Sequence, residues 1–265
     1  MRPLRQFPTT AAARIRAVFT DIDDTLTTDG RLTGAAYGAL ERLDAAGIAV
    51  VPVTGRPAGW CDMIARFWPV AGVVGENGAF YFSHDRATRR MRRQYFAPAA
   101  QRHAFAEKLA HVRNRVLSEV PGSALSADQP FRETDLAIDF CEDVAPLGPG
   151  DVARIRQIFE EEGATAKISS IHVNGWYGDY DKLSMSLRLA REVLCLDEDA
   201  CRATSAYCGD SPNDSPMFAW FEHSFGVANI ADFAGELEHR PKWVAPSRGG
   251  AGFVEIAQAF LRART

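Results

Sequence analysis

The chain has 265 residues, of which 46% are hydrophobic and 24% are charged, and its formal net charge is −4. This length suits one large domain, or a core domain with a smaller one, and the composition is that of a folded, soluble protein. Binding to nucleic acid or to a membrane surface usually requires a basic face, so the acidic balance argues against both roles.

The N-terminal residues and the cysteines bear on the compartment. Residues 1–13 contain Arg2 and Arg5 but no continuous apolar segment, and no later stretch approaches the length of a membrane span. The five cysteines are scattered, odd in number and form no C-x-x-C pair, which is typical of reduced thiols. We therefore expect a cytoplasmic protein without a signal peptide or an anchor.

Expected strands and helices alternate over the first third of the chain. The apolar run Ala17–Phe19 predicts a short buried strand, and residues 33–46 have the spacing of an amphipathic helix. Residues 48–53 form a continuous apolar run, which predicts a strand covered on both faces, and a helix should follow it. Residues 72–82 are then typical of two strands joined by a tight turn.

The regular alternation loosens after residue 83 and resumes at Lys182. The intervening part begins with a basic stretch and contains expected helices and strands at 98–120, 136–140, 149–162 and 167–173. This mixture predicts an inserted α+β domain at 84–181. Residues 1–83 and 182–265 should together form an α/β core with a Rossmann-like parallel sheet.

Acidic residues follow the first predicted strand. Asp21 and Asp23 are two positions apart, so on an extended backbone both carboxylates project to the same side. Two such charges raise each other's pKa unless a cation lies between them, and ligands that offer only oxygen suit Mg²⁺. An acidic turn after a strand would explain a bare D-x-D equally well, so the rest of the chain must decide.

Thr54 and Lys182 extend the pattern, although each also has a simpler explanation. Thr54 ends the next predicted strand, which would bring its hydroxyl beside Asp21, but it could also serve only as a helix N-cap. Lys182 opens an amphipathic helix, where the macrodipole disfavours a cation unless an anion is bound nearby. The alternative for Lys182 is a solvated side chain on the surface.

Residues 209–216, Gly-Asp-Ser-Pro-Asn-Asp-Ser-Pro, form the strongest polar cluster. They place Asp210 at the end of a predicted strand, and Asn213 and Asp214 in the loop that enters a helix. The residue types also favour a plain surface turn. Beside an Asp-x-Asp strand end, however, they indicate the second half of a metal and phosphate site, since a helix N-terminus offers free N–H groups to an anion.

The ordered set Asp-x-Asp-Asp-Thr, Thr, Lys and Gly-Asp-x-x-Asn-Asp resembles the haloacid dehalogenase superfamily of aspartyl phosphohydrolases. The resemblance covers residues 14–83 and 182–262, with all four motifs in order. An insertion between the second and third motifs, preceded by Glu76-Asn77-Gly78, is similar to the branch with a large α/β cap, which includes sugar-phosphate phosphatases. Family members often have Gly where Asp24 and Leu183 stand here, but neither change removes a reacting group.

The resemblance implies a role for each motif residue. Asp21 would attack phosphorus and become an aspartyl phosphate, while Asp23 would act as general acid and then general base. Mg²⁺ would be held by Asp21, Asp210 and the backbone carbonyl of Asp23, with Asp214 in or near its shell. The phosphate oxygens would be bound by Thr54, the Gly55 N–H, Lys182 and Asn213.

The resemblance also implies a phosphoric monoester hydrolase that acts on a small phosphorylated metabolite, most simply a sugar phosphate. The cap would close over the site and select the leaving group. Candidate selecting residues are Arg56, His172, Asn174, Trp176 and Tyr177, although packing of the hinge or of a strand would explain several of them.

Other functions stay open at this point. A phosphotransferase or phosphomutase would pass the phosphoryl group to a second substrate instead of water, and a non-catalytic protein could bind a phosphorylated ligand on the same scaffold. A receiver-type signalling domain needs an acceptor Asp where Val53-Thr54 stand, and a D-x-D glycosyltransferase leaves residues 209–214 unexplained. The pattern predicts neither the particular substrate nor the oligomeric state.

Overall fold

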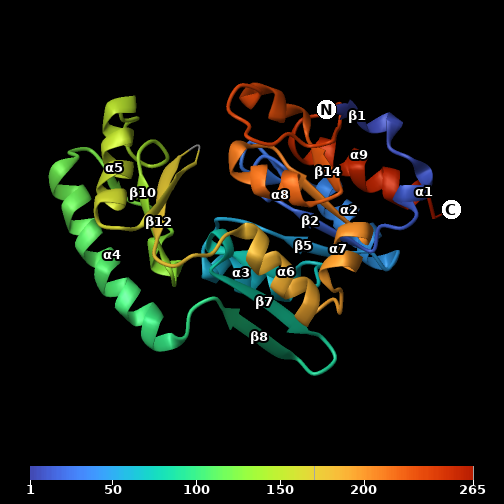
Figure 1. Cartoon of the computed structure of the whole chain (residues 1–265), viewed down its shortest axis with the longest axis horizontal. Coiled ribbons are helices and arrows are strands. Elements are labelled where there is room, and N and C mark those ends of the chain that lie inside the picture. The colour runs from blue at the N-terminus through green and yellow to red at the C-terminus, as the bar shows by residue number, and fades with distance from the viewer. Residues whose placement is uncertain (170, 265) are drawn as a thin grey trace. The chain divides into compact units, whose positions relative to one another are not determined.

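The computed structural model describes residues 1–169 and 171–264, which form two compact units. The first unit comprises Met1–Gly55, Cys61–Gln94 and Asp181–Thr265, and the second comprises Arg56–Trp60 and Tyr95–Tyr180. Figure 1 draws both units and labels many of their helices and strands. Residues 170 and 265, which fall in a predicted strand and in the predicted core, lie outside the described residues.

A parallel sheet forms the centre of the first unit. Within the described part of the chain it has six strands in the order β1-β15-β14-β13-β2-β5, and every neighbouring pair is parallel. The strands are β1 (Arg2–Pro3), β2 (Ala17–Thr20), β5 (Ala49–Pro52), β13 (Ser205–Gly209), β14 (His223–Gly226) and β15 (Trp243–Val244). The α/β class and the parallel core sheet predicted from the sequence are confirmed.

Helices cover both faces of this sheet (Figure 1). One face packs against α6 (Lys182–Glu192), α7 (Glu198–Thr204) and α8 (Ser215–Trp220), and their apolar side chains form one cluster with those of β2, β5 and β13. On the other face, α2 (Gly34–Ala45) packs against α9 (Gly249–Arg262). The central strands β2, β5 and β13 are therefore buried on both sides, which explains why β2 and β5 appear in the sequence as apolar runs.

Shorter elements complete the first unit. They are β3 (Thr27–Thr28) with β4 (Arg31–Leu32), helix α1 (Thr9–Ala12), helix α3 (Ala58–Phe67) from Cys61 onward, and the sheet β6 (Val73–Gly75), β7 (Phe80–Asp85) and β8 (Arg90–Tyr95) up to Gln94. Strands β6 and β7 are antiparallel, as expected, and a 3-10 turn at Glu76–Gly78 joins them. A Cβ on Gly78 would lie 2.0 Å from the Asp181 carbonyl oxygen, so only glycine fits beside the start of α6.

The second unit is an antiparallel sheet with two long helices. In its described part the strands have the order β11-β12-β10-β9, and the elements are α4 (Ala99–Glu119), β9 (Ala124–Leu125), β10 (Asp135–Asp139), α5 (Pro149–Glu161), β11 (Thr165–Ile168) and β12 (His172–Trp176). Side chains of α4 and α5 form a separate hydrophobic cluster with Leu136, Ile138 and Val173. This unit has the α+β composition predicted for the insertion.

Two details differ from the sequence-based expectation. Residues 84–94 were assigned to the insertion, but they continue the β7–β8 hairpin and belong to the first unit, while residues 56–60 belong to the second. The single strand expected at 167–173 is instead part of two antiparallel strands, β11 and β12. Its β-branched residues predict a strand correctly, but they do not reveal where the chain reverses.

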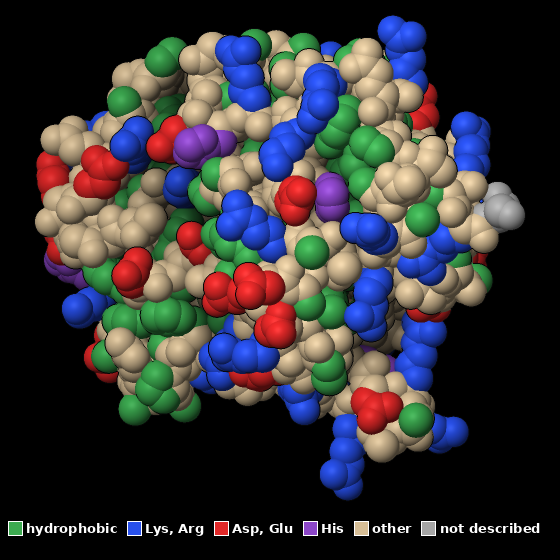
Figure 2. Space-filling view, turned by 45° about the vertical axis from the view of Figure 1, so that its right-hand side comes forward, with side chains coloured by type: hydrophobic (Ala, Val, Ile, Leu, Met, Phe, Trp, Pro, Cys, Tyr) green, Lys and Arg blue, Asp and Glu red, His purple; other side chains and the backbone are tan. Residues whose placement is uncertain are grey.

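Charged side chains of both signs are interspersed with apolar and neutral ones over the face seen in Figure 2. None of the helices in residues 1–169 and 171–264 combines the length and the apolar character that crossing a membrane requires.

Candidate active site

The candidate site lies where parallel strands of the first unit end. Asp21 follows β2, and its backbone N–H donates to the Cys208 carbonyl of β13 at 2.9 Å. Thr54 follows β5, which pairs with β2, and Asp210 follows β13. Since the carboxyl ends of parallel neighbours meet at one edge of a sheet, the topology brings these three residues to the same edge, as the sequence predicted.

Lys182 is the first residue of α6, and its ammonium group points into the site. The Asp181 side chain caps the helix by accepting the Ser184 N–H at 2.7 Å, which fixes where α6 begins. Lys182 is 6% exposed, and its Nζ lies 3.0 Å from Asp21 Oδ1 and 2.9 Å from Asp214 Oδ1. Burial alone would lower the pKa of Lys182, but the charges of the two aspartates outweigh it and raise that pKa.

Asp214 is a buried carboxylate surrounded by donors. Its Oδ1 accepts from Lys182 and from the Tyr207 hydroxyl, the latter at 2.5 Å. Its Oδ2 accepts from the backbone N–H groups of Asp210 at 3.1 Å and Ser211 at 3.4 Å. Burial, and next the charge of Asp214, raise the pKa of Tyr207 well above its ordinary value, so the hydroxyl stays protonated and donates.

Asp210 is held from two other elements. Its Oδ1 accepts from the Thr25 hydroxyl at 2.9 Å, and its Oδ2 accepts from the Asn229 amide at 2.9 Å. The same Asn229 amide donates to the Asp24 carbonyl at 3.0 Å, and its Oδ1 accepts from the Gly249 N–H at 3.0 Å. Asn229 thus connects the loop after β2 with Asp210 and with the start of α9.

The turn after β2 has the backbone that the sequence suggested. Asp24 has a φ of 54°, in the left-handed region that glycine favours and that Asp tolerates better than most residues. Its N–H donates to the Thr27 hydroxyl at 3.0 Å, which stabilises the turn. Asp23 is half-buried in the same turn, and Gly55 lies next to Thr54, where a Cβ would come within 3.0 Å of the Asn77 side chain. The Asn213 side chain accepts from the Ser211 hydroxyl at 2.8 Å.

The donor set fits a divalent cation. Asp21, Asp210 and Asp214 each offer a carboxylate oxygen, and these atoms all lie within 4.8 Å of one another. Burial, against the opposing charge of Lys182, raises the pKa of Asp21 to about 7. Burial and then the neighbouring carboxylates raise the pKa of Asp210 to about 8. In the described part of the site, one ammonium group faces three buried carboxylates, so a bound cation would relieve the repulsion that remains. Hard oxygen ligands of this kind suit Mg²⁺.

The five candidate selecting residues belong to the second unit. His172, Asn174 and Trp176 alternate along β12 and so share one face of its sheet. His172 Nε2 lies 2.8 Å from a Glu142 carboxylate oxygen, Asn174 donates to Asp135 at 3.2 Å, and Trp176 stacks on Tyr180. Tyr177 lies in the hydrophobic cluster of the unit and donates to the Glu162 carbonyl at 2.9 Å, and Arg56 lies over the Trp60 ring.

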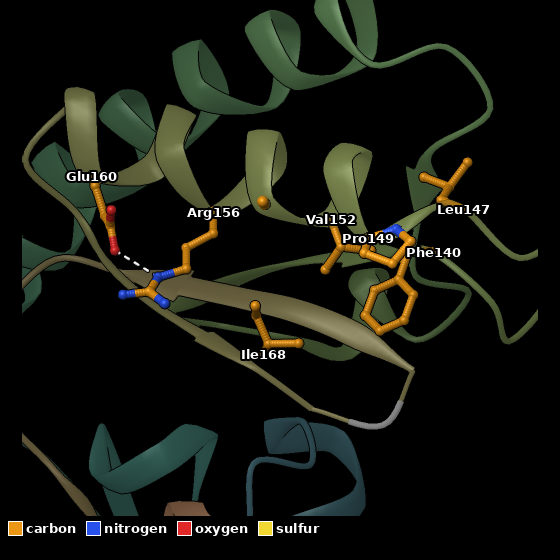
Figure 3. Close-up of a pocket in the computed structure, with 8 residues that line it drawn as sticks. Phe140, Leu147, Pro149, Val152, Arg156, Glu160 and Ile168 are labelled. Atoms are coloured by element: carbon orange, nitrogen blue, oxygen red, sulfur yellow. Dashed lines mark hydrogen bonds and ion pairs between the residues drawn. The ribbon is translucent and has the colours of Figure 1, made fainter. Parts of the chain in front are cut away.

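A separate cavity of about 580 Å³ lies between α5 and β11 of the second unit (Figure 3). Its wall is mainly apolar, with Phe140, Leu147, Val152 and Ile168, and the Arg156 guanidinium donates to Glu160 at 2.7 Å along one side. None of the described residues that line it belongs to the predicted site. The predicted site residues therefore lie at the strand ends of the first unit, not in this cavity.

Thr25, Tyr207 and Asn229 are site residues that the sequence analysis did not assign. Thr25 belongs to the quoted Asp-x-Asp-Asp-Thr motif, so its polarity beside the acidic pair was a usable signal. Tyr207 appears as one more large side chain in a strand, and its hydroxyl gives no local signal. Asn229 lies in a 3-10 turn after β14, and only the fold brings that turn to Asp24 and Asp210.

Comparisons with known proteins agree with this geometry. A family model described as haloacid dehalogenase-like hydrolase matches residues 18–119. No match is found among curated proteins. Among solved structures, protein 0175 of Thermoplasma acidophilum is similar to this chain, with a TM-score of 0.68 and 22% sequence identity. The aligned region covers 93% of this chain and 98% of the Thermoplasma chain.

Two further structures have the same fold. The sucrose-phosphatase of Synechocystis sp. PCC6803, solved with sucrose and phosphate, has a TM-score of 0.64 at 14% identity and covers 92% of this chain and 97% of its own. A trehalose-6-phosphate phosphatase related protein has a TM-score of 0.63 at 16% identity, and the aligned region covers 93% of this chain and 97% of that protein's chain. The family model therefore agrees with the resemblance seen in the motifs over residues 18–119, and the solved structures share the fold of this chain.

Proposed function

We propose that this protein is a Mg²⁺-dependent phosphatase, a phosphoric monoester hydrolase that acts on a small phosphorylated metabolite in the cytoplasm. The observation that carries the proposal is the Lys182 ammonium group, buried between Asp21 and Asp214 at the ends of the parallel strands. A fixed cation beside a carboxylate at such an edge provides a place for a phosphoryl group and a nucleophile that faces it.

In the proposed reaction, an Asp21 oxygen forms a bond to phosphorus while the bond from phosphorus to the ester oxygen breaks. Asp23 gives its proton to the leaving alkoxide. A water molecule then attacks the phosphorus of the aspartyl phosphate and gives a proton to Asp23, which releases inorganic phosphate and restores Asp21. The phosphate oxygens are bound by Lys182, Thr54, Asn213 and the Gly55 N–H.

The metal ion has its own set of residues in this proposal. Asp21, Asp210 and the Asp23 backbone carbonyl would hold Mg²⁺, with Asp214 in or near the shell. The bound ion would neutralise charge on the transferring phosphoryl group and among the carboxylates. The raised pKa values of Asp21 and Asp210 support this assignment, because a cation restores the ionised state that both roles need.

The second unit is proposed to be a cap that selects the leaving group, with Arg56, His172, Asn174, Trp176 and Tyr177 as candidates. A sugar phosphate is the favoured substrate class. The structures of a sucrose-phosphatase and of a trehalose-6-phosphate phosphatase related protein, which have the same fold, support this choice.

The test is phosphate release from a panel of sugar phosphates, nucleotides and cofactor phosphates, with Mg²⁺ or with EDTA. We expect Mg²⁺-dependent release that Asp21→Asn and Asp23→Asn abolish while the protein stays folded. Asp44→Asn is the matched control, since Asp44 is exposed on α2 and should tolerate the change. Full activity of Asp21→Asn, with deamidation excluded by mass spectrometry, would refute the nucleophile. Transfer of phosphate to a second sugar instead of water would identify a phosphotransferase.

A further inference from the structure

Tyr207 is a buried tyrosine in the middle of β13 whose ring and hydroxyl have different surroundings. The side chain is fully buried, and its ring centroid lies 5.7 Å from those of both Phe218 and Phe221. The register pairs Tyr207 with Phe19 of β2, on the sheet face that α6, α7 and α8 cover. Phenylalanine would fill this space equally well, so the hydroxyl needs an explanation of its own.

The Tyr207 hydroxyl completes the hydrogen bonding of Asp214. A carboxylate has about four lone-pair positions. Among the described residues, the donors to Asp214 are the Tyr207 hydroxyl, Lys182 Nζ and the backbone N–H groups of Asp210 and Ser211. The bond from Tyr207, at 2.5 Å, is the shortest of these, as expected for a hydroxyl that donates to a charged acceptor. Asp214 is therefore held in one orientation by protein groups.

Asp210 is bonded differently, although it lies four residues away on the same loop. Each of its oxygens accepts one side-chain donor, from Thr25 and from Asn229, which leaves acceptor capacity on both. Among residues 1–169 and 171–264, Lys182 Nζ donates to Asp21 and to Asp214, so one N–H of its three stays available for a phosphate oxygen. The three acidic residues thus differ in how much of their bonding capacity protein donors occupy.

We propose that Tyr207 is a positioning residue that makes Asp214 the fixed counter-ion of Lys182, and that Asp214 is not a direct ligand of the metal. Through Asp214, the hydroxyl keeps the Lys182 ammonium beside Asp21, where it can bind a phosphoryl group. This inference rests on the proposed function, because that function gives Lys182 a phosphate to bind.

The proposal predicts different effects on phosphate and on metal. Tyr207→Phe keeps the ring and removes one charge-assisted hydrogen bond, so the dissociation constant for inorganic phosphate should rise about tenfold and kcat should fall about tenfold. The dissociation constant for Mg²⁺ alone should change less than about twofold, since ligand atoms are untouched. General damage to the site would weaken both, so the comparison separates positioning from a merely structural role.

Tyr81→Phe is the matched control. Tyr81 is also fully buried in the first unit, belongs to the same hydrophobic cluster, and donates its hydroxyl to the Glu192 carboxylate at 2.6 Å. The substitution removes the same kind of bond at a place outside the site. Affinity for phosphate, affinity for Mg²⁺ and kcat should all stay at the wild-type level.

The experiment is calorimetric titration of the folded full chain with MgCl₂, and with inorganic phosphate at saturating Mg²⁺, for the wild type, Tyr207→Phe, Tyr81→Phe and Asp214→Asn. Turnover of p-nitrophenyl phosphate is measured in parallel. Asp214→Asn should weaken phosphate binding more than Tyr207→Phe does, with little change for Mg²⁺. If Tyr207→Phe does not fold, the Asp214→Asn titrations decide the question.

Two results would overturn the inference: phosphate binding by Tyr207→Phe within twofold of wild type, or a loss of Mg²⁺ affinity as large as the loss of phosphate affinity. A wild type that binds phosphate but hydrolyses no ester would defeat the proposed function instead, and the titrations would still test Tyr207. A wild type that binds no phosphate would overturn both.

Discussion

The Lys182 ammonium nitrogen lies 3.0 Å from Asp21 Oδ1, although 161 positions separate the two residues. The contact joins the end of β2 to α6, the helix with which the chain re-enters the core after the second unit. Both groups are buried, so the pair contributes to function and to stability together.

Lys182→Met should therefore reduce both the phosphatase activity and the stability of the protein. Loss of the cation removes a proposed phosphate-binding donor, and we expect turnover to fall at least about 100-fold. The buried carboxylates of Asp21 and Asp214 also lose their partner, which should lower the free energy of unfolding by about 3 kcal/mol without Mg²⁺. Urea unfolding and phosphate-release assays measure the two effects. Lys242→Met, at an exposed position of the same unit, should change neither, and wild-type turnover in Lys182→Met would contradict the assignment.

Asn229→Ala should destabilise the protein, because Asn229 holds both the loop after β2 and the Asp210 side chain in place. The substitution removes bonds to Asp210 and to the Asp24 carbonyl, and it leaves the Gly249 N–H without its partner. Unfolding in urea should show a loss of about 2 kcal/mol, because buried polar groups are left unsatisfied. Asn114→Ala on the exposed side of α4 should stay within about 0.5 kcal/mol of wild type. A loss of unfolding free energy no larger than that of Asn114→Ala would show that the hydrogen bonds of Asn229 do not stabilise the fold.

Asp24 offers a test of the backbone conformation. Because its φ is 54° and its side chain is exposed, Asp24→Gly should be more stable than Asp24→Ala by about 1 kcal/mol. At Glu41, an exposed position inside α2, Glu41→Ala should instead be more stable than Glu41→Gly, since Gly disfavours a helix by about 1 kcal/mol. The four variants can be compared by thermal unfolding. An Ala variant as stable as the Gly variant at position 24 would argue against the left-handed turn.

Stabilisation by Mg²⁺ should depend on pH. The folded-state pKa of Asp21 is raised to about 7 and that of Asp210 to about 8, both from 3.8. Without metal, these carboxyl groups contribute stability that is fully present below pH 3.8 and is lost as the pH rises through 7 to 8. Mg²⁺ competes with the same protons, so the increase in Tm that it causes should be small at pH 5 and should grow up to pH 8.

The control for this prediction is Asp210→Asn, which removes one of the titrating groups and a proposed ligand. Its increase in Tm with Mg²⁺ should be small at every pH, with NaCl used to match the ionic strength. An increase in the wild type that is the same at pH 5 and pH 8 would be inconsistent with Asp21 and Asp210 as the metal-binding carboxylates.

The sequence predicts the central sheet and the edge of the site because both follow from local patterns. Apolar runs that end in Asp21, Thr54 and Asp210 identify parallel strands and the polar residues at their carboxyl ends. The turn at Asp24 could also be predicted, because few residue types tolerate its conformation. In each case the signal lies within a few positions of the residue concerned.

The remaining features depend on contacts between distant segments. Asn229 binds Asp24 across 205 positions, and a single asparagine in a turn carries no mark of such a partner. The partner of the Tyr207 hydroxyl could not be predicted either, since the hydrophobic pattern identifies Tyr207 only as a large residue in a strand. The start of the insertion was misplaced for a related reason: residues 84–94 are polar and basic like a linker, but they pair as a hairpin with the core.

The most direct measurement of the central claim is chemical trapping of the covalent intermediate on the wild-type protein. Enzyme that is turning over a substrate is quenched and treated with borohydride, which reduces an aspartyl phosphate to homoserine, and the peptide spanning the end of β2 is analysed by mass spectrometry. We expect homoserine at position 21, dependent on substrate and absent from Asp21→Asn. Homoserine at a different carboxylate, or continued phosphate release by Asp21→Asn, would contradict the account.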